Sequence, residues 1–212
     1  IDETGLVGIV YGAKLERNIV DSDGEEIETA EWVERKCSGL DADSVIALWA
    51  ELGRVYRDAL SEYEASVDCF DNILLLDIDH EESVASLEAL LENGVCVEEI
   101  CRALSRVYEH RGNYDGLQKV LVRLANCQSD SRDKISYLVR ASQINREILD
   151  NTDATLECLS AALLTDPSCE TVKQVLLEIA DSANCWERVV AILENVASSI
   201  AVEEGEENLL AT

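Results

Sequence analysis

The sequence predicts an all-α fold, an α-solenoid in which antiparallel helix pairs stack on one another. From residue 42 onward apolar residues recur every three or four positions, which is the period of one helix face. The chain has one Pro and ten Gly, too few for the many tight turns of a β-sandwich or barrel. Its second half also repeats its first, and because one helix pair cannot bury its apolar face alone, such repeats stack.

The apolar period defines nine helices. In the first, Leu48, Leu52 and Tyr56 lie on one face, and Asn93-Gly94 marks the end of the third. The predicted helices cover residues 44–60, 64–76, 82–93, 97–111, 114–126, 131–149, 154–165, 168–182 and 186–199.

An internal duplication joins the two halves. Residues 47–111 align with residues 136–200 at a shift of 89 positions without a gap, and 13 of the 65 pairs are identical. About 5 identities are expected by chance for such a composition. Cys69 recurs as Cys158, which indicates a core position of a duplicated unit. Chance similarity between two helical stretches rich in Leu, Glu and Ala is the alternative.

The two ends lie outside this array. Residues 1–41 are predicted to hold N-terminal helices or a partial repeat, with one helix over 25–37. Residues 3–19 carry a helical apolar stripe interrupted by glycines, for which a strand over 6–11 is the alternative. Residues 201–212 are predicted to be a mobile acidic tail.

Charge excludes several functions. The chain carries 17 Lys and Arg against 44 Asp and Glu, a formal net charge of −27. Such a surface repels phosphate backbones, so we expect no nucleic-acid partner and no attraction to anionic membranes. No apolar run reaches the roughly 18 residues of a transmembrane helix, so membrane insertion is not expected. Because the chain lacks Met and begins at Ile1, we expect a processed product or a fragment.

No catalytic motif is present. The sequence has no phosphate-binding glycine loop, no H-E-x-x-H and no G-x-S-x-G, and it has two His. We therefore predict a non-enzymatic protein with no cofactor.

The eight cysteines are predicted to be small buried hydrophobic residues rather than a metal or redox site. No C-x-x-C occurs, and Cys96 and Cys101 would diverge on a helix. Free thiols favour a reducing cytoplasm. The cysteines are Cys37, Cys69, Cys96, Cys101, Cys127, Cys158, Cys169 and Cys185.

A local motif points to a known family. Trp49, Leu52, Gly53 and Tyr56 reproduce W-x₂-L-G-x₂-Y, the first-helix signature of the tetratricopeptide repeat, and Phe70 stands at an aromatic position of the second helix. Residues 42–200 therefore resemble this family, most closely its long bacterial arrays. The resemblance implies a right-handed solenoid whose concave face holds a segment of a partner protein. Trp32, Trp49 and Trp186 are all predicted to be core residues.

The scarce basic residues suggest where a partner would bind. By the resemblance, seven residues lie on first helices of repeats and line the concave face, where guanidinium groups could hold carboxylates of an acidic or amphipathic segment. The alternative is that they are counter-charges for neighbouring acids. They are Arg54, Arg57, Arg102, Arg106, Arg140, Gln143 and Arg146.

Three functions therefore compete: a scaffold that binds a protein or peptide partner, a structural fragment of a larger array stacked on further repeats of the same chain, and a metal or redox module that uses the cysteines. The sequence favours the first.

Overall fold

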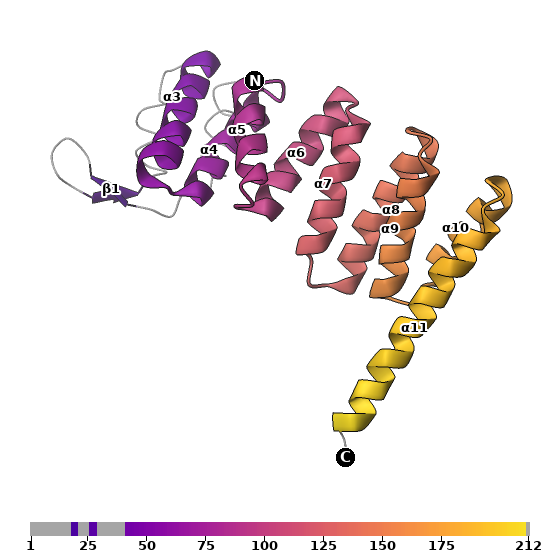
Figure 1. Cartoon of the computed structure of the whole chain (residues 1–212). Helices are drawn as coiled ribbons and strands as arrows, with labels where there is room; N and C mark the ends of the chain where they lie inside the picture. Colours follow the sequence, from indigo (N-terminus) through magenta and orange to yellow (C-terminus); the bar gives the residue numbers. More distant parts are fainter. Residues whose placement is uncertain (1–17, 21–25, 29–40, 211–212) are drawn as a thin grey trace. The chain divides into compact units, whose positions relative to one another are not determined.

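The computed structural model describes residues 18–20, 26–28 and 41–210, with side chains for 41–200 (Figure 1). It divides into two compact units, Ile1–Arg111 and Gly112–Thr212. From Ala42 to Leu210 the described residues form consecutive helices, each packed on its neighbours within its unit. The all-α prediction for residues 42–200 is confirmed.

The described part of unit 1 contains a short hairpin, four α-helices and one π-helical turn. Strands β1 and β2 are antiparallel, with Ile19 opposite Ile27. The predicted helix over 25–37 is therefore wrong at Glu26–Glu28, where cross-strand pairing replaces it; its remainder, and the possible strand over 6–11, lie outside the described residues. The elements are β1 (Asn18–Val20), β2 (Glu26–Glu28), α3 (Ala42–Val55), the π-helical turn η1 (Tyr56–Leu60), α4 (Tyr63–Leu76), α5 (Glu81–Glu92) and α6 (Val97–Arg111).

Unit 2 contains five described helices. The predicted end at residue 199 is wrong, because helical backbone continues to Leu210 through most of the predicted tail. The helix expected from residue 168 begins at Glu170, since Asp166 forms a turn in which its carboxylate accepts the Ser168 N–H at 2.8 Å. The helices are α7 (Tyr114–Cys127), α8 (Ser131–Glu147), α9 (Thr152–Thr165), α10 (Glu170–Ser182) and α11 (Trp186–Leu210).

Helix α3 lies very close to α4 at Gly53. A Cβ at Gly53 would stand 3.1 Å from two ring carbons of Phe70 and 3.2 Å from the Cβ of Cys69. Ser66, also on α4, donates its hydroxyl to the Gly53 carbonyl at 2.9 Å. The glycine in the repeat signature is therefore explained by packing: any side chain there would displace Phe70.

The same local geometry recurs 89 residues later. Ser61 and Asp150 both adopt a left-handed conformation, with φ of 56° and 50°. The next amide, Glu62 or Asn151, donates to the carbonyl six residues back, at 2.9 Å in the first case and 2.8 Å in the second. Such a bond satisfies an otherwise unpaired carbonyl at a helix end.

The loop after the second helix also repeats. Asp77 and Asp166 each donate their amide to the carbonyl four residues earlier, at 2.8 and 3.0 Å. Each carboxylate then accepts the amide two residues later, from Asp79 at 3.1 Å and from Ser168 at 2.8 Å. At this shift α4 and α9 have identical bounds.

Burial agrees with the predicted stripes in most places. Trp49 is 2% exposed, which confirms its place in the core, and Cys69 and Cys158 are both buried. Trp186 is 44% exposed, so its predicted core position is wrong, whereas Trp32 lies outside the described residues. No described helix of unit 2 follows α11 to cover Trp186.

The Gly53 contact yields a stability prediction. Gly53→Ser should destabilise the chain by about 1–3 kcal/mol, because the added atoms overpack a filled space against Phe70. The second copy has Ser142 and Leu159 at these two positions, both buried. The double variant Gly53→Ser with Phe70→Leu should therefore lose less free energy of unfolding than the two single variants lose in sum. Urea unfolding followed by circular dichroism measures all three losses. Strict additivity would contradict the packing explanation.

Candidate functional site

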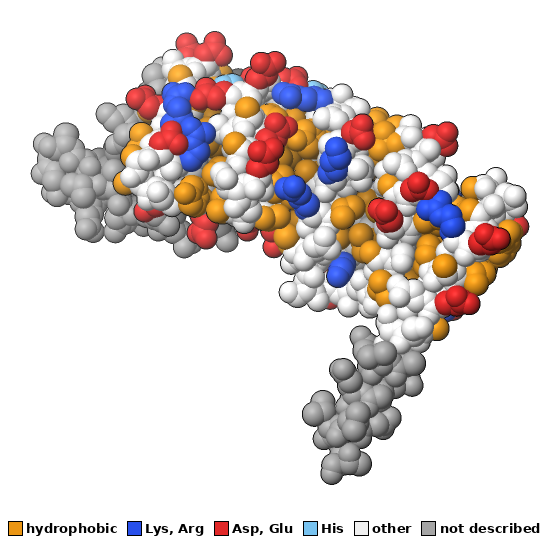
Figure 2. Space-filling view, in the orientation of Figure 1, with side chains coloured by type: hydrophobic (Ala, Val, Ile, Leu, Met, Phe, Trp, Pro, Cys, Tyr) orange, Lys and Arg blue, Asp and Glu red, His pale blue; other side chains and the backbone are white. Residues whose placement is uncertain are grey.

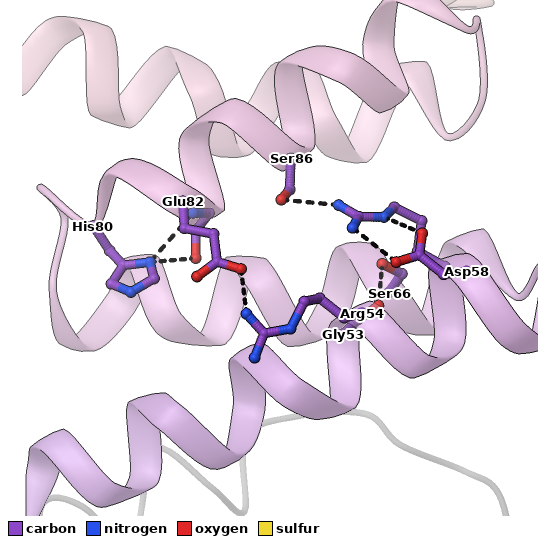
Figure 3. Close-up of polar contacts among 9 residues, drawn as sticks. Gly53, Arg54, Asp58, Ser66, His80, Glu82 and Ser86 are labelled. Atoms are coloured by element: carbon purple, nitrogen blue, oxygen red, sulfur yellow. Dashed lines mark hydrogen bonds and ion pairs between the residues drawn. The ribbon is translucent and has the colours of Figure 1, made fainter.

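Arg54 of α3 extends toward Glu82 of α5 (Figure 3). Arg54 Nη1 donates to Glu82 Oε1 at 2.5 Å. Arg57 Nη1 donates to Ser86 Oγ at 3.1 Å, and its Nε donates to Asp58 Oδ1 at 2.7 Å. The pKa of Asp58 is lowered chiefly because Arg57 donates to its carboxylate. Both arginines therefore reach α5, Arg54 through Glu82 and Arg57 through Ser86.

Arg57 has a second contact. Its guanidinium carbon lies 5.9 Å from the centroid of the Phe70 ring, within range of a cation–π interaction. The pKa of Arg57 is raised, first because it donates a hydrogen bond to Asp58. Arg57 thus connects the α3–α4 contact to α5.

The arginines of α6 contact other elements. Arg102 pairs with Glu98 one turn earlier on the same helix, and Arg106 pairs with Asp71 of α4. The Arg106–Asp71 pair joins α6 to α4, and the contacts of Arg54 and Arg57 reach from α3 and η1 to α5. Within unit 1 the structure brings Arg54 and Arg57 together at α5, while Arg102 and Arg106 interact at α4 and α6.

Three predicted residues lie on α8 of unit 2. Arg140, Gln143 and Arg146 are all exposed, and Arg146 Nη2 lies 3.1 Å from Glu147 Oε1. The ion pairs that five of these arginines form are compatible with a role as counter-charges; the five are Arg54, Arg57, Arg102, Arg106 and Arg146. Their role in binding a partner stays a prediction.

The α4–α6 surface of unit 1 differs in charge from its counterpart in unit 2. Glu64 and Glu99 correspond at the 89-residue shift to Asp153 and Arg188. In unit 2 these two form an ion pair of 2.5 Å between α9 and α11. The first copy has two carboxylates at the same positions, so the two copies differ in charge on a surface they otherwise share.

This charge affects Asp68 of α4. Its pKa is raised, first by partial burial and then by the neighbouring carboxylates of Asp71, Glu64 and Glu99. Burial raises the pKa of the Cys96 thiol, and the carboxylates of Glu99, Glu64 and Asp68 raise it further. Such a thiol stays protonated at neutral pH, which is unfavourable for metal or redox chemistry.

A groove of about 470 Å³ runs between α9 and α11 in unit 2. Leu164 on its wall is 46% exposed, and Ala161 and Ile192 are half-buried. Charged residues border this apolar strip. The groove is lined by Asp153, Leu156, Glu157, Ser160, Ala161, Leu164, Arg188, Ala191 and Ile192.

Sequence reasoning did not identify this groove. Leu164 is identical to Leu75 at the 89-residue shift, and both leucines are about half exposed, at 46% and 52%. The sequence does contain a signal for this surface. Glu99 of the first copy corresponds to Arg188 of the second, so the charge at this position differs between the copies.

A second hollow of unit 2, about 690 Å³, lies beside the loops that precede α8 and α10. Its carboxylates already form the turns: Asp130 accepts the amides of Arg132 at 2.8 Å and Asp133 at 3.1 Å, and Asp166 accepts that of Ser168. We assign it no ligand.

The cysteines divide by exposure. Cys69, Cys101 and Cys158 are buried as predicted, and burial raises the pKa of Cys69 to about 12. Cys127 is exposed, so its predicted burial is wrong; it is the last residue of α7, where the apolar stripe has ended. Cys96, Cys169 and Cys185 are intermediate, and Cys37 lies outside the described residues.

Among the described residues, no group of three or more His, Cys, Asp or Glu side chains is placed to hold a metal ion. In the same part of the chain no helix combines the length and the apolar character needed to cross a membrane. Comparison of the chain with protein-family models, curated proteins and solved structures finds no significant match.

Asp68 yields a pH-dependent prediction. Because its pKa is raised in the folded chain, its charged form destabilises the fold above its unfolded pKa, and this penalty disappears as pH falls and the carboxyl is protonated. Asp68→Asn should therefore raise the free energy of unfolding at pH 7 by about 1 kcal/mol or less, and change it little at pH 3.

The matched control is Asp58→Asn, which should change the free energy of unfolding at pH 7 in the opposite direction. The pKa of Asp58 is lowered by Arg57, so its loss should reduce stability at pH 7 and have little effect at low pH. Urea titrations at both pH values measure both changes. If both variants changed the free energy of unfolding equally at each pH, the acidic surface would not be destabilising the fold.

Proposed function

We propose that this protein is a non-catalytic interaction scaffold, a right-handed array of tetratricopeptide-like helix pairs that binds a segment of a partner protein. The groove between α9 and α11 supports this proposal best. It combines an exposed leucine with half-buried apolar residues and a charged border, as protein-recognition surfaces do.

The groove chemistry favours a polypeptide over a small metabolite. Small-molecule sites bury most of the ligand and converge a few polar groups on it. Here Leu164 is open to solvent, and Arg188 is already paired with Asp153. An amphipathic segment that covers Leu164 and Ile192 with apolar side chains, and meets the border with polar ones, fits this surface.

Leu164→Glu tests the groove. Burying a leucine contributes about 1.5–3 kcal/mol, so a charge at this place should reduce partner recovery tenfold or more. The full-length chain, immobilised and exposed to a native-host lysate, is compared with the variant by quantitative mass spectrometry.

Leu75→Glu is the matched control. It occupies the equivalent position on α4, is similarly exposed at 52%, and gains the same charge. A protein retained by Leu75→Glu and lost with Leu164→Glu would be a partner of the groove. Equal recovery of every protein by the two variants would rule the groove out.

The arginine surface is a second candidate site for the same function. Arg102→Ala with Arg106→Ala should lower the affinity for an acidic partner and leave the helical content unchanged. Lys119→Ala with Arg123→Ala removes two positive charges at the same spacing on α7 and serves as the control. If both double variants recover the same proteins as the native chain, Arg102 and Arg106 act as counter-charges alone.

A further inference from the structure

Helix α11 carries an exposed apolar stripe. Trp186, Val190 and Leu193 are 44%, 47% and 36% exposed, and the exposed Ala197 continues the line. Their spacing of four, three and four residues is that of the a and d positions of a coiled coil. We call these four residues the α11 seam. Figure 2 shows hydrophobic side chains at the surface over the α10–α11 end of unit 2.

The first copy of the repeat buries three of these four positions, and the fourth, Val97, is half-buried. Val190 and Leu193 correspond to Cys101 and Leu104 of α6, and both of those are 0% exposed. A leucine at the same place in the repeat is therefore fully covered in unit 1 and partly bare in unit 2. The seam has the composition of a covered helix face.

A second difference between the two copies makes the surface at the seam more apolar. In unit 1 the hydroxyl of Tyr108 on α6 donates to Glu88 Oε1 of α5 at 2.6 Å. The second copy has Ala197 and Leu177 at these positions, and Leu177 is 44% exposed. A polar contact has thus been replaced by an exposed leucine and an alanine, which lowers the cost of covering this surface with another protein.

The seam is separate from the α9–α11 groove. With 100° per residue, Val190 and Leu193 lie about 140–200° around the helix from Arg188, which pairs with α9. One helix therefore presents two surfaces, and either can be altered without the other.

We propose that the α11 seam binds one basic amphipathic helix of a partner protein. With Trp186 and Leu193 at d positions, the exposed Glu187 and Glu194 both occupy e positions, which select the partner through interhelical ion pairs. Lys or Arg on the facing helix would pair with them. A second copy of this chain would instead bring net charges of −27 together, which opposes association.

The probe is a synthetic amphipathic helix of about three heptads, with Leu and Ile at a and d and Lys at e and g. A fluorescent label on the peptide reports binding to the full-length chain through anisotropy. We expect Leu193→Glu, and independently Val190→Glu, to weaken binding at least tenfold. A peptide with Glu in place of each Lys should not bind.

Leu75→Glu of α4 is the control, because it adds the same charge at an exposed leucine outside the seam and the groove, and it should leave peptide binding unchanged. Circular dichroism verifies that each variant is folded. Equal weakening by Leu75→Glu and by both seam variants would mean general attraction to an acidic surface and would overturn the proposal. Sedimentation that shows a native dimer, dissociated by Leu193→Glu, would assign the seam to a second copy and overturn it as well. The groove proposal is tested by the recovery of native partners with Leu164→Glu, and the seam proposal is tested by peptide binding. Failure of one proposal is therefore distinguishable from failure of the other.

Discussion

The close approach of α3 to α4 at Gly53 determines much of unit 1. Because position 53 has no side chain, the Phe70 ring lies against the α3 backbone and Ser66 reaches its carbonyl. The Phe70 ring in turn lies under the guanidinium of Arg57, which reaches Ser86 of α5. One missing Cβ therefore sets the separation of the first two helices and positions the side chain that joins them to the third.

The second copy meets the same requirement with different residues. Ser142 replaces the glycine and the smaller Leu159 replaces the aromatic ring, and both are fully or nearly fully buried. The backbone bonds after Ser61 and Asp77 recur after Asp150 and Asp166. Backbone geometry is thus retained between the copies, while side chains have changed in pairs that preserve volume.

Charge distinguishes the copies where packing does not. With 17 basic residues for 44 acids, each arginine position decides which acids are neutralised. The first copy leaves Glu64 and Glu99 on an acidic surface that raises the pKa of Asp68. The second copy has the Asp153–Arg188 ion pair, and beside it lies the apolar strip of the groove. The corresponding surfaces of the two units therefore differ in charge.

The sequence by itself determined the helices. A period of 3.6 residues depends on local spacing alone, and it predicted α6 over residues 97–111 with the bounds that the structure has. It also identified the glycine signature and the equivalence of the copies. None of this required knowledge of neighbouring helices. The prediction failed at Glu26–Glu28, where pairing with a distant strand decides the backbone.

Tertiary structure alone decided which apolar faces are covered. The stripe that buries Leu104 completely leaves its counterpart Leu193 at 36% exposed, and Trp186 is open because no described helix of unit 2 follows α11 to cover it. The period of a sequence indicates which residues share a helix face, but burial depends on what lies against that face. The groove and the α11 seam follow from that second property, and so the candidate binding surfaces emerged only with the packing of the helices.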